Sequence, residues 1–119
     1  MVKIEIDVER KGKAIAELDE RNQKTASKIY ENLPIEGMAK IWKEEVYFEI
    51  PIEMNYENKS PRAERGDVSY WPPGKAFCIF YGESQPYSDV NHVGKVTENL
   101  EMFKDVKDGD KIVLRKYRS

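Results

Sequence analysis

The 119-residue chain is long enough for one domain that buries a hydrophobic core without disulfide bonds, and its single cysteine excludes a disulfide framework. Its 20 basic and 22 acidic side chains are interspersed and leave a formal charge of −2, which argues against a nucleic-acid partner because such surfaces need clustered lysine and arginine. No apolar stretch approaches the roughly 20 residues of a membrane span, so we expect no membrane partner either.

The N-terminal residues alternate between polar and apolar side chains, unlike the apolar block of a signal peptide, so we expect a cytoplasmic protein. Lysine and glutamate are abundant and glutamine occurs only at Gln23 and Gln85, a composition typical of the ion-paired surfaces of thermophilic proteins. Neither observation indicates an activity.

The first half of the chain predicts a hairpin, a helix and a second hairpin. Residues 2–9 alternate as in a half-buried strand, and residues 14–18 return after a glycine-containing turn. Asn22 suits a helix cap, and apolar residues at helical spacing follow up to the first proline, which ends the helix. Residues 35–42 and 45–50 are expected to form the second hairpin.

The middle of the chain predicts a long loop, a strand, a tight turn and an apolar strand. Residues 52–66 are polar, and surface loops of this length are often functional. A strand beginning near Val68 leads into Pro73-Gly74, which suits a type II turn because glycine can supply the positive φ. Residues 76–81 are apolar on both faces, which indicates a central strand in a covered sheet or barrel.

The last third begins with a second long loop over residues 82–91, followed by a short strand. Thr97 suits the cap of a short helix, and residues 111–117 alternate as a final strand. The whole order predicts a mainly β fold with one domain over residues 1–119. We expect a small closed barrel of about eight strands with two short helices, since closure removes exposed strand edges.

Three segments carry a family resemblance: residues 66–74 with the sequence Gly-Asp-Val-Ser-Tyr-Trp-Pro-Pro-Gly, residues 77–82, and residues 94–100. The last segment resembles a strand-to-helix passage of the cyclophilins, the barrel of the peptidyl-prolyl isomerases, and the apolar strand resembles another part of that fold. Over nearly its full length, the chain resembles a family of small bacterial and archaeal cyclophilin-like proteins that carries no established activity. The resemblance implies a cyclophilin-like barrel.

The resemblance carries over few catalytic residues. Cyclophilins place an arginine on the strand that ends in Ile-Pro, and Phe48, which cannot donate a hydrogen bond, takes that position here. Met54 matches the family's methionine, Tyr56 replaces its glutamine, and Phe77 matches an aromatic residue of the apolar strand. Losing one such donor typically costs a few kcal/mol of transition-state stabilisation. We therefore expect weak or absent isomerase activity and assign no catalytic residue.

His92 is the single histidine of the chain. A general base also needs a nucleophile and an orienting partner, and Ser88 and Asp89 are near it only in sequence. A metal site of His92, Asp89 and Cys78 has no supporting ligand spacing. We expect His92 at the rim of a site or in a structural role, with no metal and no cofactor.

Glutamates recur between residues 44 and 57, and those at positions 45, 49 and 53 share a face only if the strand continues past Pro51. A pair of carboxylates can perform acid–base chemistry. Scattered glutamates in a chain rich in lysine and glutamate are usually solvated, so we expect this series on the surface.

The Tyr-Trp-Pro-Pro-Gly segment at residues 70–74 has two interpretations. It can be a rigid corner, since proline fixes φ and tryptophan can cover one end of a core. It can also line an aromatic groove for an apolar or proline-containing ligand, with the two long loops as walls. On this interpretation the candidate ligand-binding residues are Phe48, Met54, Tyr56, Tyr70, Trp71, Phe77, Tyr87 and His92.

The sequence therefore favours a binding module whose partner is a peptide segment or a small molecule. One alternative is an unconventional prolyl isomerase, in which Arg62 or Arg65 from the long loop replaces the missing donor. Another is a structural or interaction role, for instance as a homo-oligomer.

Overall fold

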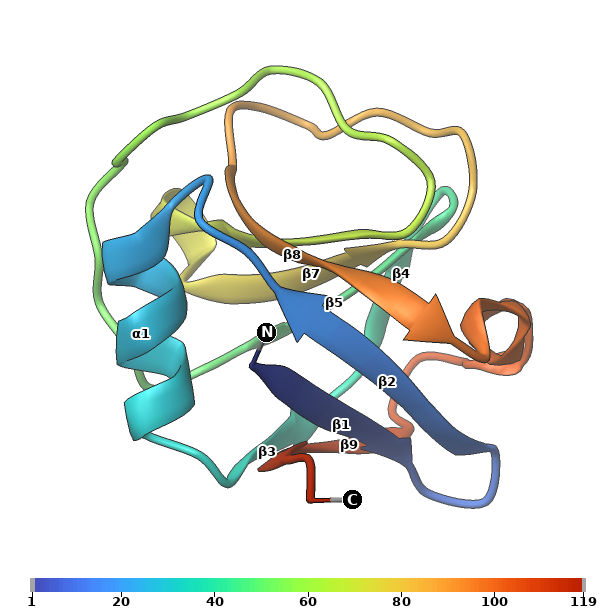
Figure 1. Cartoon of the computed structure of the whole chain (residues 1–119). Helices are drawn as coiled ribbons and strands as arrows, with labels where there is room; N and C mark the ends of the chain where they lie inside the picture. The colour runs from blue at the N-terminus through green and yellow to red at the C-terminus, as the bar shows by residue number, and fades with distance from the viewer. Residues whose placement is uncertain (1, 119) are drawn as a thin grey trace.

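Antiparallel ladders join nine strands in the computed structural model, which describes residues 2–118 (Figure 1). The strand order is β3-β9-β1-β2-β8-β6-β7-β5-β4. The strand bounds are β1 Lys3–Val8, β2 Gly12–Leu18, β3 Ile35–Met38, β4 Lys40–Trp42, β5 Glu45–Glu49, β6 Asp67–Trp71, β7 Ala76–Phe80, β8 Asn91–Glu98 and β9 Lys111–Lys116.

The two ends of this sheet approach each other, because β3 also lies against β5. Gly37 permits the approach, since a Cβ atom there would lie only 2.7 Å from Cδ2 of Phe48. The sheet therefore curls into a nearly closed barrel, which confirms the predicted mainly β fold class and its cyclophilin-like shape.

The helical elements are α1 (Gln23–Glu31) and the 3-10 helices η1 (Pro72–Gly74) and η2 (Leu100–Asp105). Helix α1 packs Ala26 and Ile29 against the barrel core. The predicted cap at Thr97 is wrong: β8 continues through this residue, and Asn99 precedes η2. No helix among the described residues is long and apolar enough to cross a membrane.

The expected hairpin over residues 35–50 is confirmed only in its second half. Strand β4 pairs with β5, whereas β3 pairs with β9, so the expected first strand changes partner at Ala39. The Ala39 N–H donates to the Asp110 carbonyl and its own carbonyl accepts from Gly109 N–H, contacts that hold this residue beside the turn before β9.

Asn22, the residue expected to cap α1, makes no capping hydrogen bond with its side chain. Asn22 precedes the helix, but its amide donates to the His92 carbonyl and accepts from Asn58 N–H. The first turn is capped instead by Glu57, whose carboxylate accepts from the backbone N–H groups of Lys24 and Thr25 at 3.3 and 3.1 Å. Glu57 is thus a structural residue, and it ties the long loop over residues 52–66 to the helix.

Strand β7 is buried along its whole length between β5 and β6, as the sequence predicts for a central strand. On β5 the side chains of Val46 and Phe48 point into the barrel, and those of Glu45 and Tyr47 lie on the opposite face. The outward side chains of β7 form a second small apolar layer: Ala76, Cys78 and Phe80.

Candidate functional site

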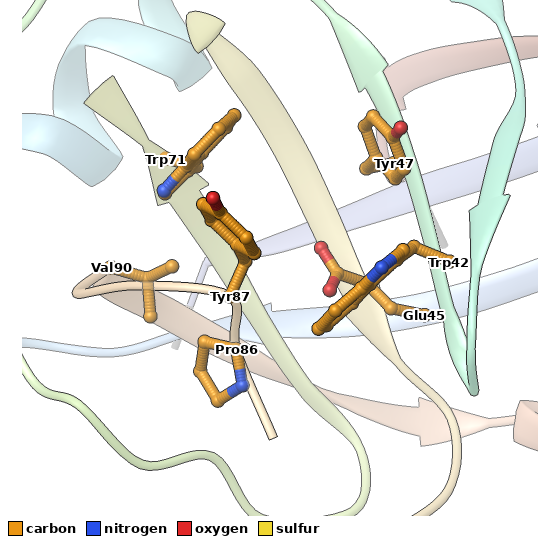
Figure 2. A pocket seen from close by; sticks show the side chains of 7 residues that line it. All are labelled: Trp42, Glu45, Tyr47, Trp71, Pro86, Tyr87 and Val90. Atoms are coloured by element: carbon orange, nitrogen blue, oxygen red, sulfur yellow. The ribbon is translucent and has the colours of Figure 1, made fainter. Parts of the chain in front are cut away.

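A pocket opens over this outer layer, between β5, β6 and the loop over residues 81–90. Its volume is about 220 Å³, and its surface is mostly apolar (Figure 2). We call it the Trp–Tyr pocket; its lining residues are Trp42, Glu45, Tyr47, Trp71, Pro86, Tyr87 and Val90.

Strand pairing brings these residues together. Trp42 and Glu45 are opposed in the β4–β5 ladder, and Tyr47 of β5 pairs with Cys78 of β7. On the other side of β7, Trp71 ends strand β6. Residues of one face of neighbouring strands therefore form a wall, and the 81–90 loop supplies the opposite wall.

The Tyr87 ring stands at right angles to each of the two tryptophan rings. Tyr87 is edge-on to Trp42, with ring centroids 6.0 Å apart and planes at 85°, and edge-on to Trp71, at 6.1 Å and 89°. Figure 2 shows Tyr87 between the two indoles. Tyr87 keeps 77% of its surface exposed, so this aromatic group lies at the protein surface and is not part of a packed core.

Trp71 is held from two sides. Its indole N–H donates to the Ser88 hydroxyl at 2.7 Å. Its ring lies across η1, where a Cβ atom on Gly74 would lie 2.6 Å from Cζ3 of the indole. The predicted type II turn is wrong, since the positive φ belongs to Lys75, at 49°. Gly74 is required for space rather than for φ, and the segment acts both as a corner and as a pocket wall.

Glu45 is the ionisable group at the pocket floor with the least exposure, at 6%. Figure 2 shows its carboxylate pointing from β5 toward the space between Trp42 and Tyr87. No lysine or arginine of residues 2–118 forms an ion pair with it. Burial raises the pKa of Glu45 to about 7, and a hydrogen bond with the Cys78 thiol opposes this rise. The expectation that this carboxylate is solvated is therefore wrong.

The Cys78 thiol is buried on β7 beside this carboxylate. Burial first, and then the neighbouring Glu45, raises the pKa of Cys78 well above its ordinary value. The thiol therefore stays protonated and is not a nucleophile, and its Sγ lies 3.9 Å from the Ala76 carbonyl oxygen, to which it donates. The exposed glutamates of the predicted acidic series, at positions 44, 49 and 53, remain at the surface as expected.

The structure divides the predicted ligand-binding set. Trp71 and Tyr87 line the Trp–Tyr pocket. Phe48, Tyr70 and Phe77 have no exposed surface and lie in the barrel core, so they cannot line a surface groove. Tyr70 instead donates its hydroxyl to the Ile52 carbonyl at 2.6 Å, which anchors the start of the long loop.

The remaining candidates lie elsewhere. Met54 and Tyr56 border a shallow depression between the long loop and η1. His92 borders a separate polar depression with Arg21 and Arg62. These sites do not merge with the Trp–Tyr pocket into one groove.

Sequence reasoning missed part of the pocket: Trp42, Glu45, Tyr47, Pro86 and Val90. A signal was present in the alternation of β5, which places Glu45 and Tyr47 on the face opposite Phe48. The two-residue turn after β4 then places Trp42 on the same face, opposite Glu45.

His92 is part of a buried hydrogen-bond network. Its Nε2 lies 2.6 Å from the Arg62 carbonyl, which can only accept, so this nitrogen carries the proton and Nδ1 accepts from the Ser69 hydroxyl at 2.6 Å. Asp67 is 3.8 Å from Nδ1 and pairs with Arg21. Ser69 has no exposed surface, so this Ser–His–Asp grouping cannot present a nucleophile and instead connects β6, β8 and the long loop.

The partners considered for His92 lie elsewhere. Ser88 holds Trp71, and Asp89 is 3.7 Å from Lys59. Among residues 2–118, no three histidine, cysteine, aspartate or glutamate side chains gather in a way that could hold a metal ion.

The position matched to the isomerase arginine faces the barrel interior, where Phe48 packs against Phe77. Arg65 pairs with Glu101, and Arg62 borders the polar depression. Neither arginine therefore replaces the missing donor.

Comparisons with known proteins agree with the architecture. The profile of the Cyclophilin-like family matches residues 2–115. The fold is similar to the solution structure of the hypothetical protein AF2241 from Archaeoglobus fulgidus, with 33% sequence identity, a TM-score of 0.84, and coverage of 98% of this chain and 95% of that one. Among curated proteins, none matches the chain.

A second solved structure is more distant in sequence. It is McbB in complex with tryptophan, with 18% identity and a TM-score of 0.82. The likeness covers 98% of this chain and 45% of that chain, and it is a likeness of fold.

Proposed function

The chain belongs to the Cyclophilin-like family, and we propose that its barrel is a binding module that holds a small molecule or a peptide segment in the Trp–Tyr pocket. The observation that carries this proposal is the mostly apolar pocket that Trp42, Trp71 and Tyr87 line. Binding sites are typically apolar hollows with a few placed polar groups, and Glu45 is such a group here.

The pocket walls are built before a ligand arrives. Trp71 is fixed by Ser88, and Trp42 is carried by the β4–β5 hairpin. The two long loops are also joined, because the Gln85 amide exchanges two hydrogen bonds of 3.0 Å with the backbone of Ala63. A preformed site lowers the entropy cost of ordering side chains on binding.

The volume limits the ligand. About 220 Å³ exceeds the ~150 Å³ of an engineered cavity that binds benzene, but it is smaller than most sites for drug-sized molecules. The pocket thus suits one side chain of a peptide or one compact group of a metabolite. The likeness covers 45% of McbB, a protein solved in complex with tryptophan, and a ligand-binding relative of this fold is consistent with the proposal.

The proposal is tested by titrating isotope-labelled protein with short Xaa-Pro peptides and a library of small molecules. Both tryptophans of the chain line the pocket, so their two indole N–H resonances report directly on it. We expect a saturable shift of both resonances with the active compounds, and its loss in Tyr87→Ala.

Tyr56→Ala is the matched control, since Tyr56 is an exposed tyrosine outside the pocket. Saturable binding that leaves both indole resonances unmoved would contradict the proposal. The same NMR samples test the isomerase alternative, because an isomerase would enhance cis–trans exchange of the Xaa-Pro peptides.

A further inference from the structure

A carboxylate buried at the floor of an aromatic pocket is costly unless it is paired or protonated. Glu45 is 6% exposed, it points into the pocket, and no cationic side chain of residues 2–118 pairs with it. The Cys78 thiol offers one weak hydrogen bond, which does not neutralise the charge. A cationic ligand group in the pocket would stabilise the ionised form of this carboxyl, for which residues 2–118 offer no ion-pair partner.

The aromatic rings near this carboxylate are a second group that attracts cations. Trp42 and Trp71 are the ring type that attracts cations best, and each stands at right angles to Tyr87. A cation held in the pocket beside these rings meets aromatic surface from more than one side. Trp42 already attracts one ammonium, since Nζ of Lys43 lies 4.7 Å from its ring centroid.

The apolar lining selects among cations. A bare metal ion or a primary ammonium would lose a strong hydration shell on entering the pocket, whereas Lys43 is exposed and its ammonium remains in water, and the pocket offers mainly ring surface in exchange. A methylated ammonium is weakly hydrated, and its methyl groups pack against rings while its charge is met by a carboxylate. An anion is disfavoured by Glu45.

Resting on the proposed function, we propose that the ligand of the Trp–Tyr pocket carries a methylated ammonium group, which packs against the rings of Trp42, Trp71 and Tyr87 and is neutralised by Glu45. Two kinds of ligand carry this group: a free quaternary amine, or a peptide with a methylated lysine side chain. The volume of about 220 Å³ accommodates either head group.

The test compares choline with its neutral carbon isostere, in which a tert-butyl group replaces the trimethylammonium. Shape and apolar area are nearly equal, so the difference in affinity isolates the charge. We expect choline to bind the wild-type protein about tenfold more tightly than the isostere, by calorimetry and tryptophan fluorescence. A trimethyllysine peptide compared with choline then distinguishes the two sources.

Glu45→Gln provides the matched variant, because it removes the charge and keeps the shape. It should reduce the preference for choline to the part that the rings supply, and leave binding of the isostere unchanged. Glu49→Gln is the control, since Glu49 is exposed on the same strand and outside the pocket. Thermal unfolding of both variants verifies that each is folded.

Equal binding of choline and isostere would overturn the cation inference and leave the binding module standing. Failure of both choline and the trimethyllysine peptide to bind would also overturn it, and the peptide and small-molecule titration would then decide the proposed function separately. Retention of the full choline preference in Glu45→Gln would exclude Glu45 as the partner of the charge.

Discussion

The Trp71 indole N–H donates to the Ser88 hydroxyl at 2.7 Å, and this hydrogen bond joins β6 to the loop that carries Tyr87. One wall of the pocket is thereby fixed to the other. Because Val90 is the single buried residue of the loop over residues 81–90, this bond bears on the shape of the pocket more than on the stability of the barrel.

Ser88→Ala removes the acceptor of the Trp71 indole. An exposed hydrogen bond contributes roughly 0.5–1.5 kcal/mol, so we expect less than about 1 kcal/mol of lost unfolding free energy and several-fold weaker ligand binding. Urea denaturation and a ligand titration measure the two effects. Ser84→Ala is the control in the same loop, since Ser84 accepts from Glu44 N–H instead; equal loss of affinity in both variants would contradict the role of the Trp71–Ser88 bond.

Gly74→Ala places a methyl group 2.6 Å from the Trp71 ring. The ring must move, so we expect a loss of about 1–3 kcal/mol of unfolding free energy together with a changed tryptophan emission. Gly109→Ala is the comparison variant. No atom lies within 4 Å of the added carbon, so its one cost is the backbone strain of an alanine at a φ of 91°. Its stability should fall while its tryptophan emission stays that of the wild type.

Because of Glu45, we expect the free energy of unfolding to decrease as pH rises from 4.5 to 7. Its pKa is raised from 4.5 to about 7 in the folded state, so the folded protein binds more protons than the unfolded chain within this interval. Stability therefore falls as pH rises from 4.5 to 7, by on the order of 3 kcal/mol at most. The groups around it are the Cys78 thiol, the Tyr47 and Tyr87 hydroxyls, and the Lys43 ammonium over Trp42.

Urea denaturation across this pH interval checks the prediction. Glu45→Gln should flatten the profile and raise stability at its upper end, whereas Glu49→Gln should leave the slope unchanged. A Glu45→Gln profile as steep as that of the wild type would assign the pH dependence to another group.

Glu57 caps α1 through the backbone N–H groups of Lys24 and Thr25. Burial alone would raise the pKa of Glu57, but the hydrogen bonds from Thr25 and Lys24 lower it below its ordinary value. Glu57→Ala should cost about 1 kcal/mol of unfolding free energy, as for other lost caps, and should speed amide exchange in the first turn of α1. Glu53→Ala in the same loop should show neither effect.

The sequence predicts the barrel because alternation and turn residues are local signals. Strand β1, the all-buried β7 and the long loops follow from them, and the register of β5 follows from Val46 and Phe48 alternating with Tyr47. The predicted hairpin over residues 35–50 failed because it depends on partners distant in sequence. Residues 35–42 divide between two ladders because Ala39 bonds to residues beside β9.

The candidate site was predictable in part for the same reason. Trp71 and Tyr87 stand out as aromatic residues at a corner and in a loop, where exposure is common. Phe48 and Phe77 are equally aromatic, but a one-residue change of position on a strand turns a side chain from the outer face into the barrel. Glu45 resembled other surface glutamates because its burial comes from rings contributed by other strands and a loop.

The most direct test of the central claim is a crystal structure of the wild-type protein soaked with a mixture of cationic, neutral and anionic small molecules. We predict ligand density between Trp42, Trp71 and Tyr87, with Glu45 at its base. Density confined to the polar depression beside Arg21 and Arg62, with an empty Trp–Tyr pocket, would contradict the account.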